Sequence, residues 1–433
     1  MPGGRWGRYG RRPLVVLCLV GLVDAVDRGV VPAVIEAIQR DLHFNDFEGG
    51  LLNTALIVAA LLLAVPGGLL ADRLDRRKLM GGVLLLWSVS TGFAALSQRF
   101  WQLFAMRALL GAGDAINDPS AQSLVADYYP VEVRGRAYAW QRVVPTVGLG
   151  LGTVMGGVVF GLAGWRVAVM TVAVPGVLVA LLVRRLPLPP RGEADGIRID
   201  EPEQLPLWPS ILAVLRVPSL RVLLVSVAFI NGILTALGFW GIAYHERASG
   251  LSESKAPGIA GGVILIGAIA GGIGGGIVTD KIRGTVRGAP MLLAGVVTGL
   301  GSIFLFISFL DGIPVYAVRL PLQMVGVALV VASLPPLTVI TAEVVPAELR
   351  GRSFGLVKVS ANVLAAVTPA LIGLIADTHH IRIHSGDLKG DLGLAFRWTT
   401  PVVLLGSVML LRGRRHVDDD IAAALGSGTH PVH

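Results

Sequence analysis

Long apolar stretches recur along the whole chain and are separated by polar segments that are mostly short. Each stretch is about 20 residues long, the length that an α-helix needs to cross a bilayer. They are continuously apolar, as in Val83-Leu84-Leu85-Leu86-Trp87, whereas strands of a membrane β-barrel alternate in polarity. We therefore predict an all-α membrane protein with twelve transmembrane helices, at 13–35, 49–71, 79–97, 101–127, 136–163, 165–183, 219–244, 257–279, 289–310, 313–342, 353–376 and 393–411.

The longest polar segment runs from Arg184 to Pro218 and is rich in proline, which is typical of a solvated linker. Its later part, 208–216, has the pattern of an amphipathic helix that lies on a membrane surface. We predict four segments, namely an N-terminal six-helix half at 1–183, a cytoplasmic linker at 184–218, a C-terminal six-helix half at 219–411 and a cytoplasmic tail at 412–433.

Two short motifs occur once in each half, at nearly the same offset. Gly67–Arg73 recurs as Gly275–Lys281, and Pro130–Arg136 recurs as Pro346–Arg352. The sequence therefore predicts two pseudo-symmetric halves arranged as parallel repeats. This architecture is typical of secondary transporters, whose halves rock around a site near the bilayer midplane.

Basic residues outnumber acidic ones, with 37 Lys and Arg against 29 Asp and Glu and a net charge of +8. In a soluble protein this charge would favour a nucleic acid partner. Here the loops on one side of the predicted membrane carry roughly three times as many Lys and Arg as the loops on the other. We therefore expect no nucleic acid partner and place both termini in the cytoplasm. The chain has no Asn-X-Ser/Thr sequon, which fits a multi-pass protein of a bacterial inner membrane.

The composition excludes several classes of protein. With 53% hydrophobic and 15% charged residues, the chain is not intrinsically disordered. Its single cysteine, Cys18, rules out an intramolecular disulfide and a cysteine-based zinc site. We interpret three histidines in the polar segment 377–392 as solvated (His379, His380 and His384). Because the sequence offers no Ser/His/Asp set or metal cluster, we expect no enzyme, metal or cofactor.

Charged residues inside the apolar runs are the main functional candidates, because charge at membrane depth is tolerated mainly beside a partner or a cavity. Asp27 and Asp114 lie near the middle of the first and fourth predicted helices. Burial favours a protonated carboxyl, and a nearby guanidinium favours the charged form. We hypothesise that these two acids bind and release protons, with Arg28 and Arg107 adjusting their affinity. A purely structural set of ion pairs is the alternative, because Asp24 and Arg28 are four residues apart.

Three cations lie in later predicted helices, with no acid at helical spacing to neutralise them (Arg142, Arg319 and Lys358). Guanidinium and ammonium groups suit a phosphate or carboxylate, so these residues are candidates to bind an anionic substrate. Arg142 and Lys358 also lie close enough to a helix end to reach water, which is the alternative. Arg28, Asn231 and Trp240 complete the predicted substrate-binding set.

Several motifs resemble the major facilitator superfamily. Gly68–Lys78 is similar to its signature loop between helices 2 and 3, Arg107–Gly113 to its helix 4 motif, and Gly148–Gly157 to its glycine-rich helix 5. One departure is Asp75, where the usual pattern has glycine. The resemblance implies a major facilitator fold and an inner gate of charge pairs at helix ends. The gating residues that it implies are Asp72, Arg73, Arg76, Asp127, Asp280 and Lys281.

Within the superfamily, four features resemble the Spinster-like lipid transporters: Asp27-Arg28, the acid of Arg107–Asp114, Leu188–Gly192 and Gly238–Trp240. That family usually has glutamate where this chain has Asp114. The anion:cation symporter branch also shows an Asp-Arg pair and a helix 4 acid, so it stays an alternative.

The sequence therefore predicts a monomeric, proton-coupled secondary transporter that works by alternating access. By resemblance, its substrate is an amphipathic anionic lipid such as a lysophospholipid, and its partners are protons and membrane lipids. Transport of small organic anions or drugs is the alternative.

Overall fold

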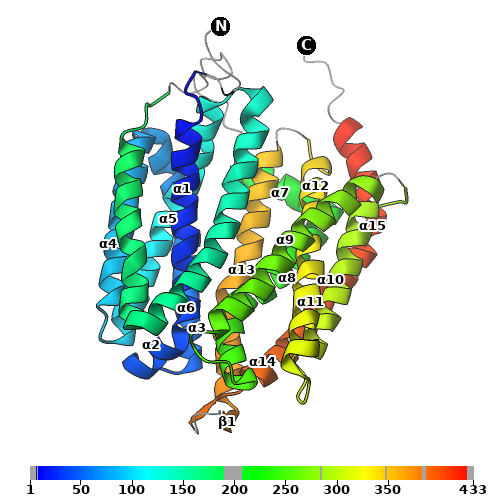
Figure 1. Ribbon diagram of the computed structural model, residues 1–433. Helices are drawn as coiled ribbons and strands as arrows, with labels where there is room; N and C mark the ends of the chain where they lie inside the picture. Colours follow the sequence, from blue (N-terminus) through cyan, green and yellow to red (C-terminus); the bar gives the residue numbers. More distant parts are fainter. Residues whose placement is uncertain are drawn as a thin grey trace. The chain divides into compact units, whose positions relative to one another are not determined.

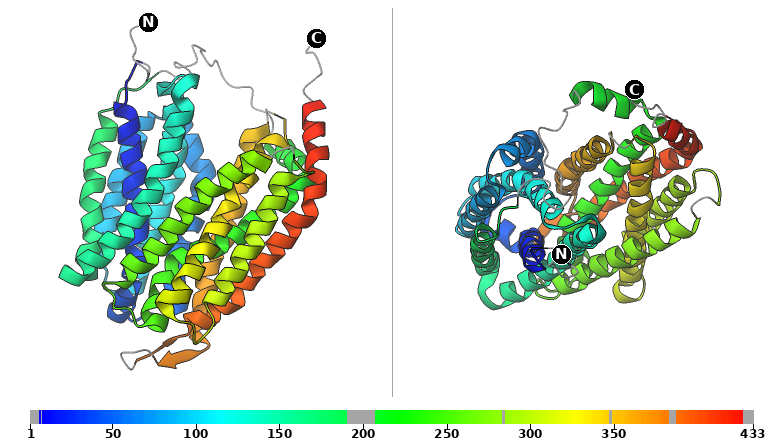
Figure 2. Two further views of the ribbon diagram at one scale, coloured as in Figure 1. Left: turned by 45° about the vertical axis from the view of Figure 1, so that its right-hand side comes forward. Right: turned by 90° about the horizontal axis from the view of Figure 1, so that it is seen from above.

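The computed structural model describes residues 6, 8–189, 207–282, 285–346, 349–382 and 387–426. The described residues form long α-helices and one short β-hairpin (Figure 1). The chain divides into two compact units, Met1–Glu203 with Leu251–Gly261 and Gln204–Gly250 with Gly262–His433. In each unit, long helices run side by side (Figure 2).

The first unit places α1 against α6, α3 against α5, and α4 against both α5 and α6. Gly152 of α6 allows α1 to approach closely, because a Cβ at this position would lie 2.1 Å from the Val26 carbonyl oxygen. The residue before Asp27 is thereby held against α6. The helices are α1 (Arg12–Ala33), α2 (Ile35–Leu42), α3 (Asp46–Arg73), α4 (Arg76–Ala95), α5 (Phe100–Tyr128) and α6 (Val131–Arg184).

The second unit packs α8 on α13 and α15, and α10 on α11 and α15. A hairpin between α13 and α14 pairs His380 with Gly390 and Arg382 with Leu388. Helix α9 begins in the first unit and continues in the second. The elements are α7 (Leu207–Arg216), α8 (Pro218–Ser249), α9 (Ala256–Ile282), α10 (Ala289–Ser308), a π-helical turn (Val315–Arg319), α11 (Leu320–Ala332), α12 (Leu334–Glu343), α13 (Arg350–Asp377), β1 (His380–Arg382), β2 (Leu388–Gly390), α14 (Leu392–Thr399) and α15 (Val403–Gly426).

Within the described residues, nine helical stretches are long and apolar enough to cross a membrane. One of them, α6, spans two predicted helices, 136–163 and 165–183. Gly164 lies between them and adopts a positive φ of 84°, which kinks the helix where the two predicted helices meet. Helices α1 and α5 fall outside this set, and charged residues interrupt the apolar pattern of both, among them Asp27 in α1 and Asp114 in α5. The prediction of an all-helical membrane protein is confirmed.

Proline-containing breaks interrupt two of the predicted helices. The stretch 313–342 is divided at Ser333, just ahead of two consecutive prolines, which cannot donate backbone hydrogen bonds. The stretch 393–411 is divided by a short 3₁₀ turn that contains Pro401. Helix α15 then continues to Gly426, so the segment predicted as a tail begins as helix.

Helix α7 lies where the sequence predicts an amphipathic helix. It packs on α8 and α13 and lies at the rim of the second unit (Figure 2). Ser210 and Val214 are buried, whereas Trp208 and Leu212 are exposed on the opposite side. The helix therefore has one face against its own unit and one apolar face that is free of it.

Asp75, the departure from the superfamily pattern, is the N-cap residue of α4. Its Oδ1 accepts hydrogen bonds from the backbone N–H groups of Arg77 and Lys78, at 3.0 and 3.4 Å. The Arg77 guanidinium also binds this carboxylate, and its hydrogen bond is the main cause that lowers the pKa of Asp75 below its usual value. A side chain that caps the helix thus replaces the usual glycine.

We expect Asp75→Ala to lower the free energy of unfolding by about 1 kcal/mol at pH 7, because the cap is lost. A lowered folded-state pKa stabilises the protein above the unfolded pKa of about 4 and ceases to do so as the pH falls through the folded value. The loss should therefore vanish in strong acid. Thermal unfolding at both pH values tests this, with Asp75→Asn as a control that keeps a capping oxygen without a charge. An equal loss at both pH values would contradict the prediction.

Candidate functional site

Three helices of the first unit bring a carboxylate and a guanidinium together in the interior. Asp27 of α1 accepts a hydrogen bond from Nη1 of Arg107 on α5, at 3.1 Å between Nη1 and Oδ2. The two side chains are only 3% and 5% exposed. Thr91 of α4 donates to the other carboxylate oxygen at 3.4 Å. Asp27 therefore has one charged partner and one neutral one.

A second ion pair involves the next residue of α1. Nη2 of Arg28 lies 2.5 Å from Oδ2 of Asp114 on α5, and its Nε lies 3.2 Å from Oδ2 of Asp24. The Arg28 side chain is 41% exposed and that of Asp114 is 12% exposed. Successive residues of a helix point about 100° apart. Asp27 and Arg28 therefore have separate partners. The Asp27–Arg107 pair is buried, whereas Arg28 in the other pair is partly exposed to solvent.

The gating candidates of the first unit include one buried pair. Nη1 of Arg76, at the start of α4, lies 2.6 Å from Oδ2 of Asp127, near the end of α5, and both side chains are buried. Nη1 also donates to Ser123 at 2.5 Å. The side chains of Asp72 and Arg73 lie outside the described part of the chain. In the second unit, Asp280 and Lys281 are exposed near the end of α9.

Two tyrosines follow Asp127, and their hydroxyl groups form hydrogen bonds with other segments of the first unit. The Tyr128 hydroxyl donates to the carbonyl oxygen of Pro187, at the start of the predicted linker, at 2.5 Å. The Tyr129 hydroxyl donates to the Gly10 carbonyl at 3.0 Å and accepts from the Leu14 N–H at 2.9 Å. Burial raises the pKa of Tyr129 to about 12, so this hydroxyl stays protonated at neutral pH.

The substrate-binding candidates of the second unit have separate surroundings. Trp240 is fully buried and donates from Nε1 to the Pro369 carbonyl at 2.8 Å. Asn231 donates to the Val227 carbonyl of its own helix at 3.1 Å, and Lys358 is exposed on α13. The Arg142 side chain, in the first unit, lies outside the described part of the chain. His384, from the polar segment 377–392, is also outside it.

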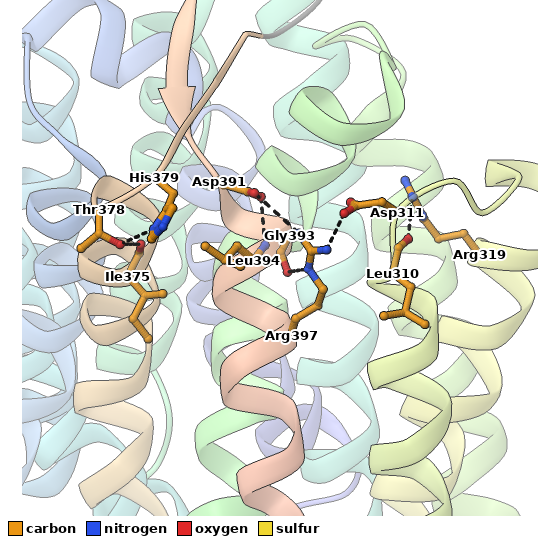
Figure 3. Close-up of polar contacts among 10 residues, drawn as sticks. All are labelled: Leu310, Asp311, Arg319, Ile375, Thr378, His379, Asp391, Gly393, Leu394 and Arg397. Carbon is orange, nitrogen blue, oxygen red and sulfur yellow. Dashed lines mark hydrogen bonds and ion pairs between the residues drawn. The ribbon is translucent and has the colours of Figure 1, made fainter.

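Arg319 is buried where the π-helical turn ends. It donates to Ser249 at 3.2 Å and to the Leu310 carbonyl at 3.4 Å, and its guanidinium lies 5.6 Å from the centre of the Tyr244 ring. Figure 3 shows the contact with Leu310 and, beside it, a separate network. In that network Arg397 binds Asp311 and lies 3.6 Å from Asp391, the N-cap residue of α14.

Sequence reasoning missed the neutral partners of these charged groups. Thr91 is one of three hydroxyl residues within an otherwise apolar stretch of α4, beside Ser88 and Ser90, and Ser123 lies in a polar part of α5, so neither stands out in the pattern. Their spacing from their partners gives no signal either, because 64 residues separate Thr91 from Asp27. Only the tertiary structure, which places α4 against α5 and brings Thr91 to Asp27, shows them.

Comparisons with known proteins identify the family and the fold of the chain. Residues 17–369 match the family described as Major Facilitator Superfamily. Protein spinster homolog 1 of Xenopus tropicalis is 28% identical over 325 residues, which cover 70% of this chain and 61% of that protein. Probable sphingolipid transporter spinster homolog 2 of Arabidopsis thaliana is 27% identical over 403 residues, which cover 85% and 81%. The match thus spans about three fifths of spinster homolog 1.

A solved structure shares the fold. A bacterial homolog of the human lysosomal transporter Spinster, in an inward-facing and occupied conformation, matches with a TM-score of 0.79 and 19% identity. The match covers 98% of this chain and 99% of that one. The superfamily consists of transporters rather than enzymes. This chain belongs to the major facilitator superfamily, and its sequence is similar to those of the spinster homologs within it.

Proposed function

We propose that this chain is a proton-coupled secondary transporter that moves an amphipathic anionic lipid, such as a lysophospholipid, by alternating access. The observation that carries the proposal is the buried ion pair between Asp27 and Arg107. A proton on Asp27 would cancel the charge that holds Arg107. The pair therefore offers two states that differ by one proton, which is what a coupling site requires.

The second ion pair supports a link between proton and substrate. Arg28 is partly exposed while it binds Asp114, so a ligand can approach its guanidinium. A phosphate or carboxylate on the substrate competes with Asp114, because guanidinium binds both kinds of oxygen acid in the same geometry. Protonation of Asp114 weakens this competitor and favours the substrate. The name of the Arabidopsis relative, a probable sphingolipid transporter, supports a lipid as the substrate class.

Uptake into proteoliposomes tests the coupling, with labelled lysophosphatidylglycerol as the probe and an imposed pH gradient. We expect Asp27→Asn and Asp114→Asn each to lower gradient-driven uptake by about tenfold or more, because asparagine cannot bind the coupled proton. A tenfold change in an equilibrium corresponds to one pKa unit. Asp24→Asn is the matched control, because Asp24 also contacts Arg28 but is 26% exposed. Unchanged uptake in both coupling variants would sink the proposal.

The same vesicles test the substrate class by competition. A lysolipid with a phosphate should compete more strongly than a monoacylglycerol of the same chain length, because only the former can replace Asp114 at Arg28. Equal potency would count against a phosphate site. Competition by short organic acids but by neither lipid would favour the alternative of small organic anions.

A further inference from the structure

A small cavity lies beside Asp27 in the first unit. The space open to the centre of a water molecule is about 10 Å³, close to the minimum that one buried water requires. The cavity is lined by side chains from α1, α4, α5 and α6. Four of them are polar and five are apolar: Asp27, Ser90, Thr91 and Arg107, with Val31, Ala94, Met106, Leu110 and Val169.

The polar lining leaves one strong donor unused. Nε of Arg107 is buried and, among the described residues, has no hydrogen-bond acceptor, although its Nη1 binds Asp27. A buried donor without an acceptor costs about 1–3 kcal/mol. Ser90 donates to its own helix at the Leu86 carbonyl, which leaves lone pairs of its oxygen free to accept. The cavity thus offers donors and acceptors together, as a bound water needs.

We propose that a single water molecule binds in this cavity, accepting a hydrogen bond from Arg107 Nε and donating to the Asp27 carboxylate. The site has the size for one water and polar groups of both kinds in its wall. No ion is needed, because Arg107 and Asp27 already balance each other's charge. The charged groups that act on Asp27 are Arg107 from α5 and Asp24 and Arg28 from its own helix, while α6 contributes only apolar lining.

The bound water can transfer a proton to and from the buried carboxylate of Asp27. A proton that arrives on the bound water passes to an oxygen of Asp27, which leaves a neutral water and a neutral carboxyl. The reverse step returns the proton and restores the bond to Arg107. This role rests on the proposed coupling function, whereas the water site itself does not.

Filling the cavity tests the site. Ala94→Val adds two methyl groups at the cavity wall, and Ala95→Val adds the same groups at the next, equally buried residue, which does not line the cavity. Infrared spectra recorded in H₂¹⁶O and H₂¹⁸O should show an isotope-sensitive O–H band in the wild type and in Ala95→Val that is lost in Ala94→Val. At a pH acidic enough to protonate Asp27, hydrogen–deuterium exchange at its carboxyl, identified by its absence in Asp27→Asn, should slow about tenfold or more in Ala94→Val alone.

Several outcomes are distinguishable. Ala94→Cys adds one heavy atom and serves as a second variant if valine unfolds the protein, which thermal unfolding of both variants reveals. The same band and exchange rate in the Ala94 variants as in Ala95→Val would overturn the proposal. If the band behaves as expected but Asp27→Asn transports normally, the water site stands and the proton-coupling function fails. If Asp27→Asn loses coupling and the band is absent from the wild type, the proton-coupling function stands and the water site fails.

Discussion

Arg107→Met is expected to lower the free energy of unfolding by about 3–5 kcal/mol at pH 7 and to abolish gradient-driven uptake. The reason is that Arg107 is the only charged group hydrogen-bonded to Asp27 within the described residues, and removing it leaves a carboxylate that is 3% exposed without a counter-charge. Thermal or denaturant unfolding in detergent measures the stability, and the proteoliposome assay measures the uptake.

The double variant Asp27→Asn/Arg107→Met separates charge from packing. Removing both partners takes away the uncompensated charge, so we expect it to regain at least about half of the lost stability. Transport should stay absent, because the proton site is gone. Losses that add up across the two single variants would show that the two residues act independently, contrary to the structure.

The second large effect is expected from Gly271→Ala on α9. A Cβ at Gly271 would lie 2.1 Å from the Ala328 carbonyl oxygen of α11, and backbone atoms cannot yield as a flexible side chain can. The two helices would have to separate, at a cost of about 1–3 kcal/mol. Gly272→Ala is the matched control, because no atom lies within 4 Å of the added Cβ. It should be neutral or slightly stabilising, since alanine favours a helix over glycine.

Comparing the thermal unfolding of these neighbouring variants removes differences in expression and detergent. Equal stability of Gly271→Ala and Gly272→Ala would show that α9 and α11 tolerate a wider separation than their contact implies. A loss in Gly271→Ala alone would support close helix packing as the reason for glycine here.

The helices could be predicted from the sequence because a bilayer requires long apolar segments whose backbone bonds are satisfied internally. This requirement also located the bend at Gly164, where two predicted helices meet within α6. The breaks at Ser333 and Pro401 escaped prediction, because the apolar pattern continues across them.

The partners within the site were less predictable. Spacing on one helix suggested that Asp24 and Arg28 meet, and they do, at 3.2 Å. The contacts of Asp27 with Arg107 and of Arg28 with Asp114 join residues 80 and 86 positions apart, so they depend on how α1 packs on α5. Charge and burial pointed to these residues, and only the tertiary structure assigns each acid to its base.

The two tyrosines after Asp127 have a practical consequence for handling the protein. The Tyr129 hydroxyl is hydrogen-bonded to the Gly10 carbonyl oxygen. A mechanical force on the N-terminal residues is therefore transmitted to the end of α5, two positions from Asp127. An affinity tag or fluorescent protein fused close to Gly10 would therefore exert force on α5, the helix that carries Asp127 of the Arg76–Asp127 ion pair. A reporter intended to leave this pair undisturbed belongs at the other terminus, while a force probe for it is best attached ahead of Gly10.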